Sequence, residues 1–317
     1  MHMADSLLSP SVGLTMCAVS AAAIVYSVAK VKKDELCEKK LPLICVMGAF
    51  VFAAQMLNFA IPGTGSSGHI GGGILLAAML GAYPAMLAVS AVLTIQCLFF
   101  ADGGLLALGC NIFNLGVIPC LIVYPLVCKP LMKQGGVAIA SVAAVVIGLQ
   151  FGAFGVVLQT SLSGIAELPF GMFLLSMLPI HLAIGLVEGV ITAVVLYFVK
   201  SGVSIKTSFA VLAVITLIAG GSLSLLASSN PDGLEWAIER VAGTAGLEIK
   251  NSFAEGAALI QEKIAFMPNY DFYNAGGSRL GTAIAGIAGS MITFIIAGFC
   301  MLSVSFFKRR DKVWSAA

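Results

Sequence analysis

Charged side chains are scarce in this chain of 317 residues. Asp, Glu, Lys and Arg make up 10% of it, whereas hydrophobic residues make up 59%. Soluble domains are about half apolar and about a quarter charged, so this composition excludes an ordinary soluble domain and is typical of a membrane protein. The formal net charge is only +2, which gives no reason to expect a nucleic-acid partner. We therefore expect a protein embedded in lipid.

The motifs of common enzyme and redox classes are also missing. None of the eight cysteines forms a C-x-x-C pair, so we expect small buried thiols rather than disulfides or a thiolate metal site. No H-E-x-x-H or G-x-S-x-G sequence is present, which argues against a membrane-embedded hydrolase. The segment GTGSSGHIGGG at 63–73 has the glycine spacing of a phosphate loop, but His69 occupies the place of its lysine. The chain is predicted to be neither an enzyme nor an ATPase.

Long apolar runs fill most of the chain. A helix needs about 20 apolar residues to cross the hydrocarbon core of a bilayer. The third run is short and rich in glycine, which indicates a partly re-entrant helix. We predict an all-α integral membrane protein with about nine transmembrane helices, at 11–29, 42–60, 70–82, 84–100, 105–127, 135–157, 170–199, 207–227 and 281–306.

Basic residues mark the loops that stay in the cytoplasm. They follow the first, fifth, seventh and ninth predicted helices, for example in KVKKDELCEKK at 30–40 and FFKRRDK at 306–312. With nine crossings, this pattern places the N-terminus outside the cell and the C-terminus inside.

A single long polar segment, at about 228–280, divides the chain. It lies outside by the same count, and residues 252–265 within it have the spacing of an amphipathic helix. We predict a bundle of about seven helices in 1–204 and a second unit in 205–317, a hairpin of two helices around an extracytoplasmic cap.

The N-terminus carries a possible metal chelate. No basic targeting region precedes the first apolar run, and His2 should protect Met1 from removal, so we expect a free amine there. The Met1 amine, the His2 amide and His2 Nδ1 can close adjacent five- and six-membered rings in one plane, a geometry that suits Ni(II) or Cu(II). His69, predicted on the same face, is the candidate fourth ligand. A terminal histidine that is simply solvated remains the alternative.

Several polar residues lie within or beside the predicted helices, where they are costly and often functional. We expect Gln96, Asp102, Asn111 and Asn114 to hydrogen-bond the metal ligands and the folded-in N-terminus; bonds that only join helices are the alternative for each. His181 and Glu188 share one face of the seventh predicted helix. They suggest a proton relay or a structural bond, and we expect His181 to lie too deep to reach the external site.

Five segments together resemble a known family. They are MHMADSLLSP at the N-terminus, GTGSSGHIGGG at 63–73, QCLFFADGGLLALGCNIFNLG at 96–116, HLAIGLVEGVIT at 181–192 and SSNPDGLEW at 228–236. The first four resemble the substrate-specific (M) components of cobalt and nickel energy-coupling-factor transporters. The last resembles the PDGLE segment of their N component, here fused behind the M component.

The resemblance implies a seven-helix substrate component whose N-terminus folds inside. It implies that the ligands are the Met1 amine, the amide and ring nitrogens of His2, and the His69 ring. The stretch Met3-Ala4-Asp5-Ser6 departs from the Ile-Pro-Asp-Gly-like stretch of many relatives, which leaves the packing of the entering strand open.

The function implied by the resemblance is uptake of Ni²⁺ or Co²⁺ across a prokaryotic cell (inner) membrane. The ion would be cargo, with no separate cofactor, and the partners would be a transmembrane coupling component and cytoplasmic ATPases. Nickel is preferred because a planar site of four nitrogens suits it. The alternative is a metal–proton secondary transporter, independent of ATP, that uses His181 and Glu188.

Overall fold

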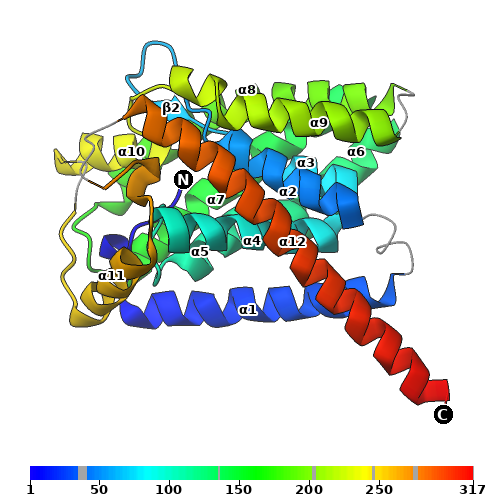
Figure 1. Cartoon of the computed structure of the whole chain (residues 1–317). Coiled ribbons are helices and arrows are strands. Elements are labelled where there is room, and N and C mark those ends of the chain that lie inside the picture. Colours follow the sequence, from blue (N-terminus) through cyan, green and yellow to red (C-terminus); the bar gives the residue numbers. More distant parts are fainter. Residues whose placement is uncertain (35–40, 135, 202–204, 245–246, 274–277, 317) are drawn as a thin grey trace.

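The computed structural model describes residues 1–34, 41–134, 136–201, 205–244, 247–273 and 278–316. Long helices lie side by side, and α10 (Gly233–Ala242) and α11 (Ser252–Ile264) lie at the end where the N-terminus enters (Figure 1). Within the described residues, six helical segments are long and apolar enough to cross a membrane. They are α1 (Pro10–Lys33), α4 (Ala82–Phe100), the run Leu108–Gln134, α7 (Gly136–Ser163), α8 (Phe170–Lys200) and the Arg279–Cys300 part of α12 (Arg279–Ala316).

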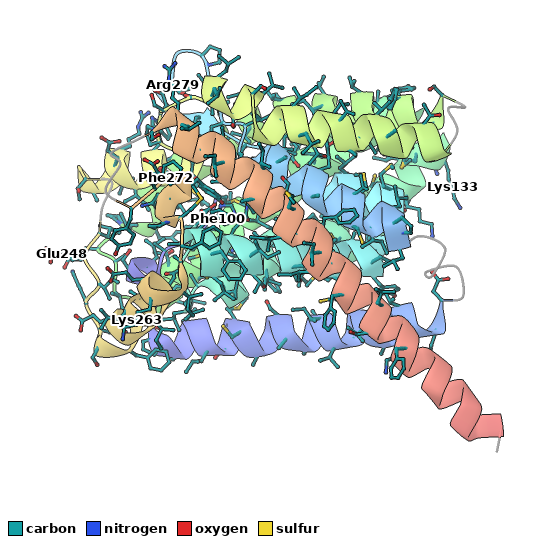
Figure 2. The ribbon with its side chains drawn as sticks, viewed as in Figure 1. Phe100, Lys133, Glu248, Lys263, Phe272 and Arg279 are labelled. Carbon is teal, nitrogen blue, oxygen red and sulfur yellow. The ribbon has the colours of Figure 1, made fainter. Side chains whose placement is uncertain are left out.

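The long helices are apolar on their outer faces as well as their inner ones. In α8, Phe173 and Met177 are buried in the core, while Leu175 and Leu182 are exposed. An exposed apolar face of this kind is expected where a helix contacts lipid. The labelled charged residues lie at the ends of the bundle: Glu248, Lys263 and Arg279 at the cap end, and Lys133 at the other (Figure 2).

The segment between the first and fourth predicted helices differs in part from the prediction. Helix α2 (Leu41–Gln55) ends five residues before the predicted boundary, and the chain then forms a hairpin of β1 (Phe59–Ala60) and β2 (Ser67–Gly68). Helix α3 (Gly73–Leu80) has only eight residues, as its glycine-rich sequence indicated. The count of nine crossings stays a prediction.

The fifth predicted helix is one continuous but irregular segment. It begins as α5 (Leu108–Ile112), continues as the π-helix η3 (Phe113–Cys128) and ends as α6 (Lys129–Gln134). Pro119 and Pro125 lie inside η3. Proline removes a backbone donor and crowds the preceding turn, so a wider helical turn is a physical response to it.

The two C-terminal helices pack directly against a helix of the N-terminal bundle. Both α9 (Ile205–Gly220) and α12 contact α2, and they contact each other. A Cβ added to Gly286 of α12 would overlap the carbonyl oxygen of Gly220 in α9. Small residues at such crossings let helix backbones approach closely.

The polar segment between α9 and α12 forms the cap. It contains the 3₁₀ turn η4 (Leu223–Leu226), α10, α11 and the turn η5 (Pro268–Tyr270). The amphipathic helix predicted at 252–265 is confirmed as α11. All cysteines in the described part of the chain are free, and Cys37 lies outside the described residues.

The Gly286–Gly220 crossing gives a first test. Gly286→Ala should lower the melting temperature in detergent, because overpacking a tight contact costs about 1–3 kcal/mol, or roughly 2–4 °C per kcal/mol. The matched control is Gly256→Ala in α11, where an added Cβ meets nothing within 4 Å. The control should be neutral or stabilising, because alanine is the better helix former. Equal melting temperatures for the two variants would contradict the packing.

Candidate metal site at the N-terminus

The first residues of the chain enter the bundle and are buried there. Met1 is 5% exposed and Met3 is fully buried. Asn111 holds Met3 in the manner of a neighbouring strand: its Oδ1 accepts from the Met3 amide at 2.7 Å and its Nδ2 donates to the Met3 carbonyl at 3.2 Å. The Met3 carbonyl also accepts from the Gly104 amide at 2.9 Å. Hydrogen bonds therefore hold both the amide and the carbonyl of Met3, which fixes the entering strand at this residue.

The FADGG segment forms the platform for this strand. Ala101 and Gly103 both have positive φ, at 52° and 78°, so the chain turns sharply after α4. The Asp5 carboxylate accepts from the Ala107 amide at 2.9 Å, and burial raises the pKa of Asp5. A Cβ on Gly104 would overlap this carboxylate. Glycine at 104 is thus required by the close approach of the N-terminal strand.

The α-amine of Met1 lies between two side chains from distant parts of the sequence. Its nitrogen is 2.6 Å from Asp232 Oδ2 and 3.4 Å from His69 Nε2. Two nitrogen ligands that bind one metal at about 2.05 Å and 90° lie about 2.9 Å apart. The amine and His69 are therefore within about half an ångström of the spacing of adjacent ligands.

The ring nitrogen of His69 that faces the amine, Nε2, is the one with a free lone pair. Its Nδ1 lies 3.2 Å from the carbonyl oxygen of Ile70. A carbonyl oxygen can only accept, so Nδ1 carries the proton and Nε2 keeps its lone pair. Burial, and next the positive charge of the amine, lower the pKa of His69 to about 3. His69 is consequently a neutral imidazole at physiological pH, as a metal ligand must be.

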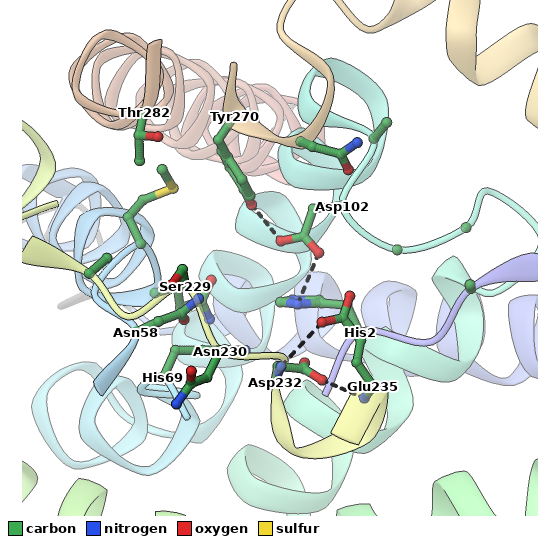
Figure 3. A pocket seen from close by; sticks show the side chains of 18 of the residues that line it. His2, Asn58, His69, Asp102, Ser229, Asn230, Asp232, Glu235, Tyr270 and Thr282 are labelled. Carbon is green, nitrogen blue, oxygen red and sulfur yellow. Dashed lines mark hydrogen bonds and ion pairs between the residues drawn. The ribbon is translucent and has the colours of Figure 1, made fainter. Parts of the chain in front are cut away.

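His2 lies against His69 but is turned toward a carboxylate. The two rings are stacked, with centroids 5.3 Å apart and planes 9° from parallel. Nδ1 of His2 is 3.3 Å from Asp102 Oδ1, and the other oxygen of Asp102 accepts from the Tyr270 hydroxyl at 2.5 Å (Figure 3). Burial lowers the pKa of His2, against the opposing effect of Asp102. The structure thus brings His2 to the site without directing Nδ1 to the amine.

Asp232 was not among the residues predicted from the sequence. It caps α10, where its Oδ1 accepts from the amides of Leu234 and Glu235 at 2.8 Å. In return, the Glu235 carboxylate accepts from the Asp232 amide at 3.2 Å. Burial alone would raise the pKa of Asp232, but the α-ammonium and the α10 donors outweigh it and hold this pKa well below its usual range. The D-G-L-E sequence is a readable capping-box signal, although it does not reveal which group the aspartate meets.

The other predicted polar residues hold the surroundings of the site. Gln96 donates to Gln55 at 2.6 Å, and Gln55 donates to the Gly71 carbonyl at 3.0 Å. Asn114 pairs with Gln159 at 2.8 Å. Of the four residues expected around the ligands, Asp102 contacts His2, and Asn111 contacts the N-terminal strand. Asn114 also donates to the Met3 sulfur at 3.9 Å, whereas Gln96 mainly joins helices.

Glu188 and His181 have separate roles in the described structure. Both oxygens of Glu188 accept backbone N–H groups, from Gly71 and Gly72, each at 2.9 Å. Glu188 therefore fixes the loop that carries His69. His181 lines a small cavity together with Met1 and His69. The expectation that His181 lies too deep to join the external ligand set stays a prediction, although His181 lines the same small cavity as two of the proposed ligand residues.

A cavity of about 780 Å³ opens onto the site from the cap end. Its wall includes His2 and His69, and its carboxylates are Asp5, Asp102, Asp232 and Glu235. Carboxylates that line a cleft attract cations. Within the described residues, no three His, Cys, Asp or Glu side chains are grouped as metal ligands, so a site here needs the backbone nitrogens of the N-terminus.

Gly104→Ala tests the position of the strand. The added methyl group would displace Asp5 and the strand that carries Met1 and His2, so Ni²⁺ affinity measured by calorimetry should fall about 10–100-fold, as for other groups that orient ligands. Gly171→Ala is the control, because an added Cβ there meets nothing within 4 Å. Unchanged affinity in Gly104→Ala would refute the proposed role of the platform.

Comparison with known proteins gives two family matches. Residues 2–204 match the model of the cobalt uptake substrate-specific transmembrane region, and residues 206–305 match that of the PDGLE domain. A putative fused nickel transport protein (NikMN) of Archaeoglobus fulgidus is 33% identical over 95% of this chain and 98% of its own length. A probable fused nickel transport protein (LarMN) of Lactiplantibacillus plantarum is 35% identical over 63% of this chain and 64% of its own length.

Solved structures give a matching result. The crystal structure of a truncated transition metal transporter superposes with a TM-score of 0.56, at 29% identity, over 63% of this chain and 99% of that one. With the six long apolar helices, these relatives establish a multi-pass membrane protein whose homologues are transport proteins. The chain therefore belongs to the cobalt uptake substrate-specific transmembrane family, in the form that carries a C-terminal PDGLE domain.

Proposed function

We propose that this chain is the substrate-capture component of an energy-coupling-factor transporter for Ni²⁺, or Co²⁺. The ion is held by the Met1 amine, the amide and Nδ1 of His2, and Nε2 of His69. The observation that carries this proposal is the contact of 3.4 Å between the amine and the lone pair of His69 Nε2. The names of the fused relatives, which are nickel transport proteins, favour nickel.

Metal binding then changes the partners of the N-terminus. A coordinating amine must lose its proton and its bond to Asp232, and His2 Nδ1 must leave Asp102. The His2 ring already lies beside His69, and we expect a rotation of its side chain to turn Nδ1 from Asp102 toward the amine. The ion is cargo in this scheme, and no resident cofactor takes part.

The remaining assignments follow from this proposal. Residues 1–204 form the metal-binding unit and 205–317 the N-type unit, with the loop 228–280 outside the membrane. We infer nine crossings, an extracytoplasmic N-terminus and a cytoplasmic C-terminus, because the loops rich in Lys and Arg then lie in the cytoplasm. The sequence has no phosphate-loop lysine, so a transmembrane coupling component and cytoplasmic ATPases must supply the energy.

The alternative of a metal–proton transporter receives less support. A relay needs His181 and Glu188 to exchange a proton, yet Glu188 is bonded to Gly71 and Gly72 and His181 to the Met177 carbonyl. Strict dependence of uptake on the ATPase partners would exclude it.

Changes at the two ends of the proposed ligand set test this function. Both His69→Ala and an N-terminal extension of five residues should weaken Ni²⁺ binding by at least ~100-fold, since losing a ligand costs more than losing a group that orients one. They should also abolish the absorption of planar Ni(II). The extension must exceed one residue, because a histidine at the third position would form its own chelate with two amides.

The same five residues added at the C-terminus provide the control and should leave the affinity unchanged. If the extended protein binds Ni²⁺ as tightly as the original, the amine is not a ligand and the proposal fails.

A further inference from the structure

His181 holds a buried lone pair that the proposed site does not use. The side chain is 1% exposed, and its Nδ1 lies 2.8 Å from the Met177 carbonyl oxygen. Because this oxygen can only accept, Nδ1 carries the proton of the neutral ring and Nε2 keeps the lone pair. Nε2 has no hydrogen-bond partner in the described part of the chain. A buried polar atom without a partner costs about 1–3 kcal/mol and needs an explanation.

His181 lines a small cavity that also borders the N-terminal site. The cavity has a volume of about 10 Å³ and is lined by Met1, His69, His181 and Asp232, among others. That is room for about one water molecule or one metal ion. An imidazole lone pair is a ligand that suits nickel and cobalt, and His69 and Asp232 line the same cavity. The described residues do not group three such side chains as a ready-made metal site, so an ion in this cavity would have fewer protein ligands than at the N-terminus.

The small cavity is one of three in series. It shares His69 and Asp232 with the large cavity at the cap end. It shares Gly71 and Leu149 with a further cavity of about 20 Å³, which is lined by Glu188 two helical turns deeper along α8. Neighbouring cavities in this series thus share lining residues, from the cap end past His181 to Glu188.

Gly233 keeps the space in front of His181 open. A Cβ at this position would lie 3.1 Å from Cε1 and 3.4 Å from Nε2 of His181. Any side chain in place of Gly233, which follows Asp232 directly, would therefore crowd the lone pair. Glycine in the PDGLE turn therefore leaves room beside this nitrogen that a side chain would fill.

We propose that His181 Nε2 is a second ligand for the transported ion, which it receives from the four-nitrogen site in the cavity bordered by His69 and Asp232. The proposal rests on the proposed function and extends it to the inward path of the cargo. His69 can remain bound while the chelate of Met1 and His2 is released, so the ion passes between two imidazoles without becoming free. With fewer nitrogen ligands, the second site holds the ion more weakly and lets it move on.

The test uses the full chain, tagged only at its C-terminus and produced with its coupling and ATPase partners. His181→Leu has a side chain of related bulk without a lone pair, whereas His181→Cys restores a metal ligand. Radioactive Ni²⁺ uptake gives the rate, and calorimetry with the absorption spectrum gives binding at the first site. His181→Leu should keep its Ni²⁺ affinity within ~3-fold but lose at least ~10-fold in uptake rate, and His181→Cys should regain much of that rate.

Three results would overturn this assignment. Uptake at the original rate in His181→Leu would mean that the cavity holds only water and plays no part in transport. Equal slowing in the Leu and Cys variants would mean that His181 acts through packing. Loss of Ni²⁺ binding in both would place it in the first site or in the fold. The proposed function fails separately, if the unmodified chain lacks the planar Ni(II) spectrum or if His69→Ala does not affect uptake.

Discussion

The arrangement of the site depends on one ion pair, between the α-ammonium of Met1 and Asp232 at 2.6 Å. Bringing two charges out of water is costly, and the pair is stable only where further hydrogen bonds support it. The support comes from α10, whose first amides fix Oδ1 of Asp232 and leave Oδ2 for the amine. The PDGLE domain therefore contributes directly to the position of the N-terminus. In the proposed function, Asp232 and Asp102 hold the amine and His2 until a metal displaces them.

Much of the fold could be predicted from the sequence, because apolar length is a local property. The runs that became α1, α7 and α8 were placed to within a few residues, apart from a somewhat longer end on α7. The end of α2 was missed because residues 56–61 stay apolar apart from Asn58, so hydropathy gives no stop signal until Pro62. The hairpin is instead held by a long-range contact, in which the Ser67 amide donates to the Pro231 carbonyl at 2.8 Å.

In the site, too, the contacts between sequence neighbours could be predicted, whereas those between distant residues could not. Met1 and His2 are neighbours in sequence, so their chelate geometry can be worked out from covalent structure. His69 could be selected because the chain has only three histidines. Asp232, by contrast, is 231 residues from Met1, and a cap rich in acids resembles any solvated segment. The shared cavity of His181, Met1 and His69 could not be read from the sequence for the same reason, since it depends on where the N-terminal strand lies in the bundle.

Choice of metal in the proposed site is a matter of geometry rather than of affinity. For nitrogen ligands, intrinsic affinity rises from cobalt to nickel to copper, so a flexible site would favour copper. Zinc prefers a tetrahedron of ligands, which three nitrogens held in one plane by fused chelate rings cannot supply. The bonds from Asn111 to both polar groups of Met3 limit how far this plane can bend. In the proposed site, a strand fixed in this way disfavours zinc, which agrees with the proposal of Ni²⁺ or Co²⁺ as cargo.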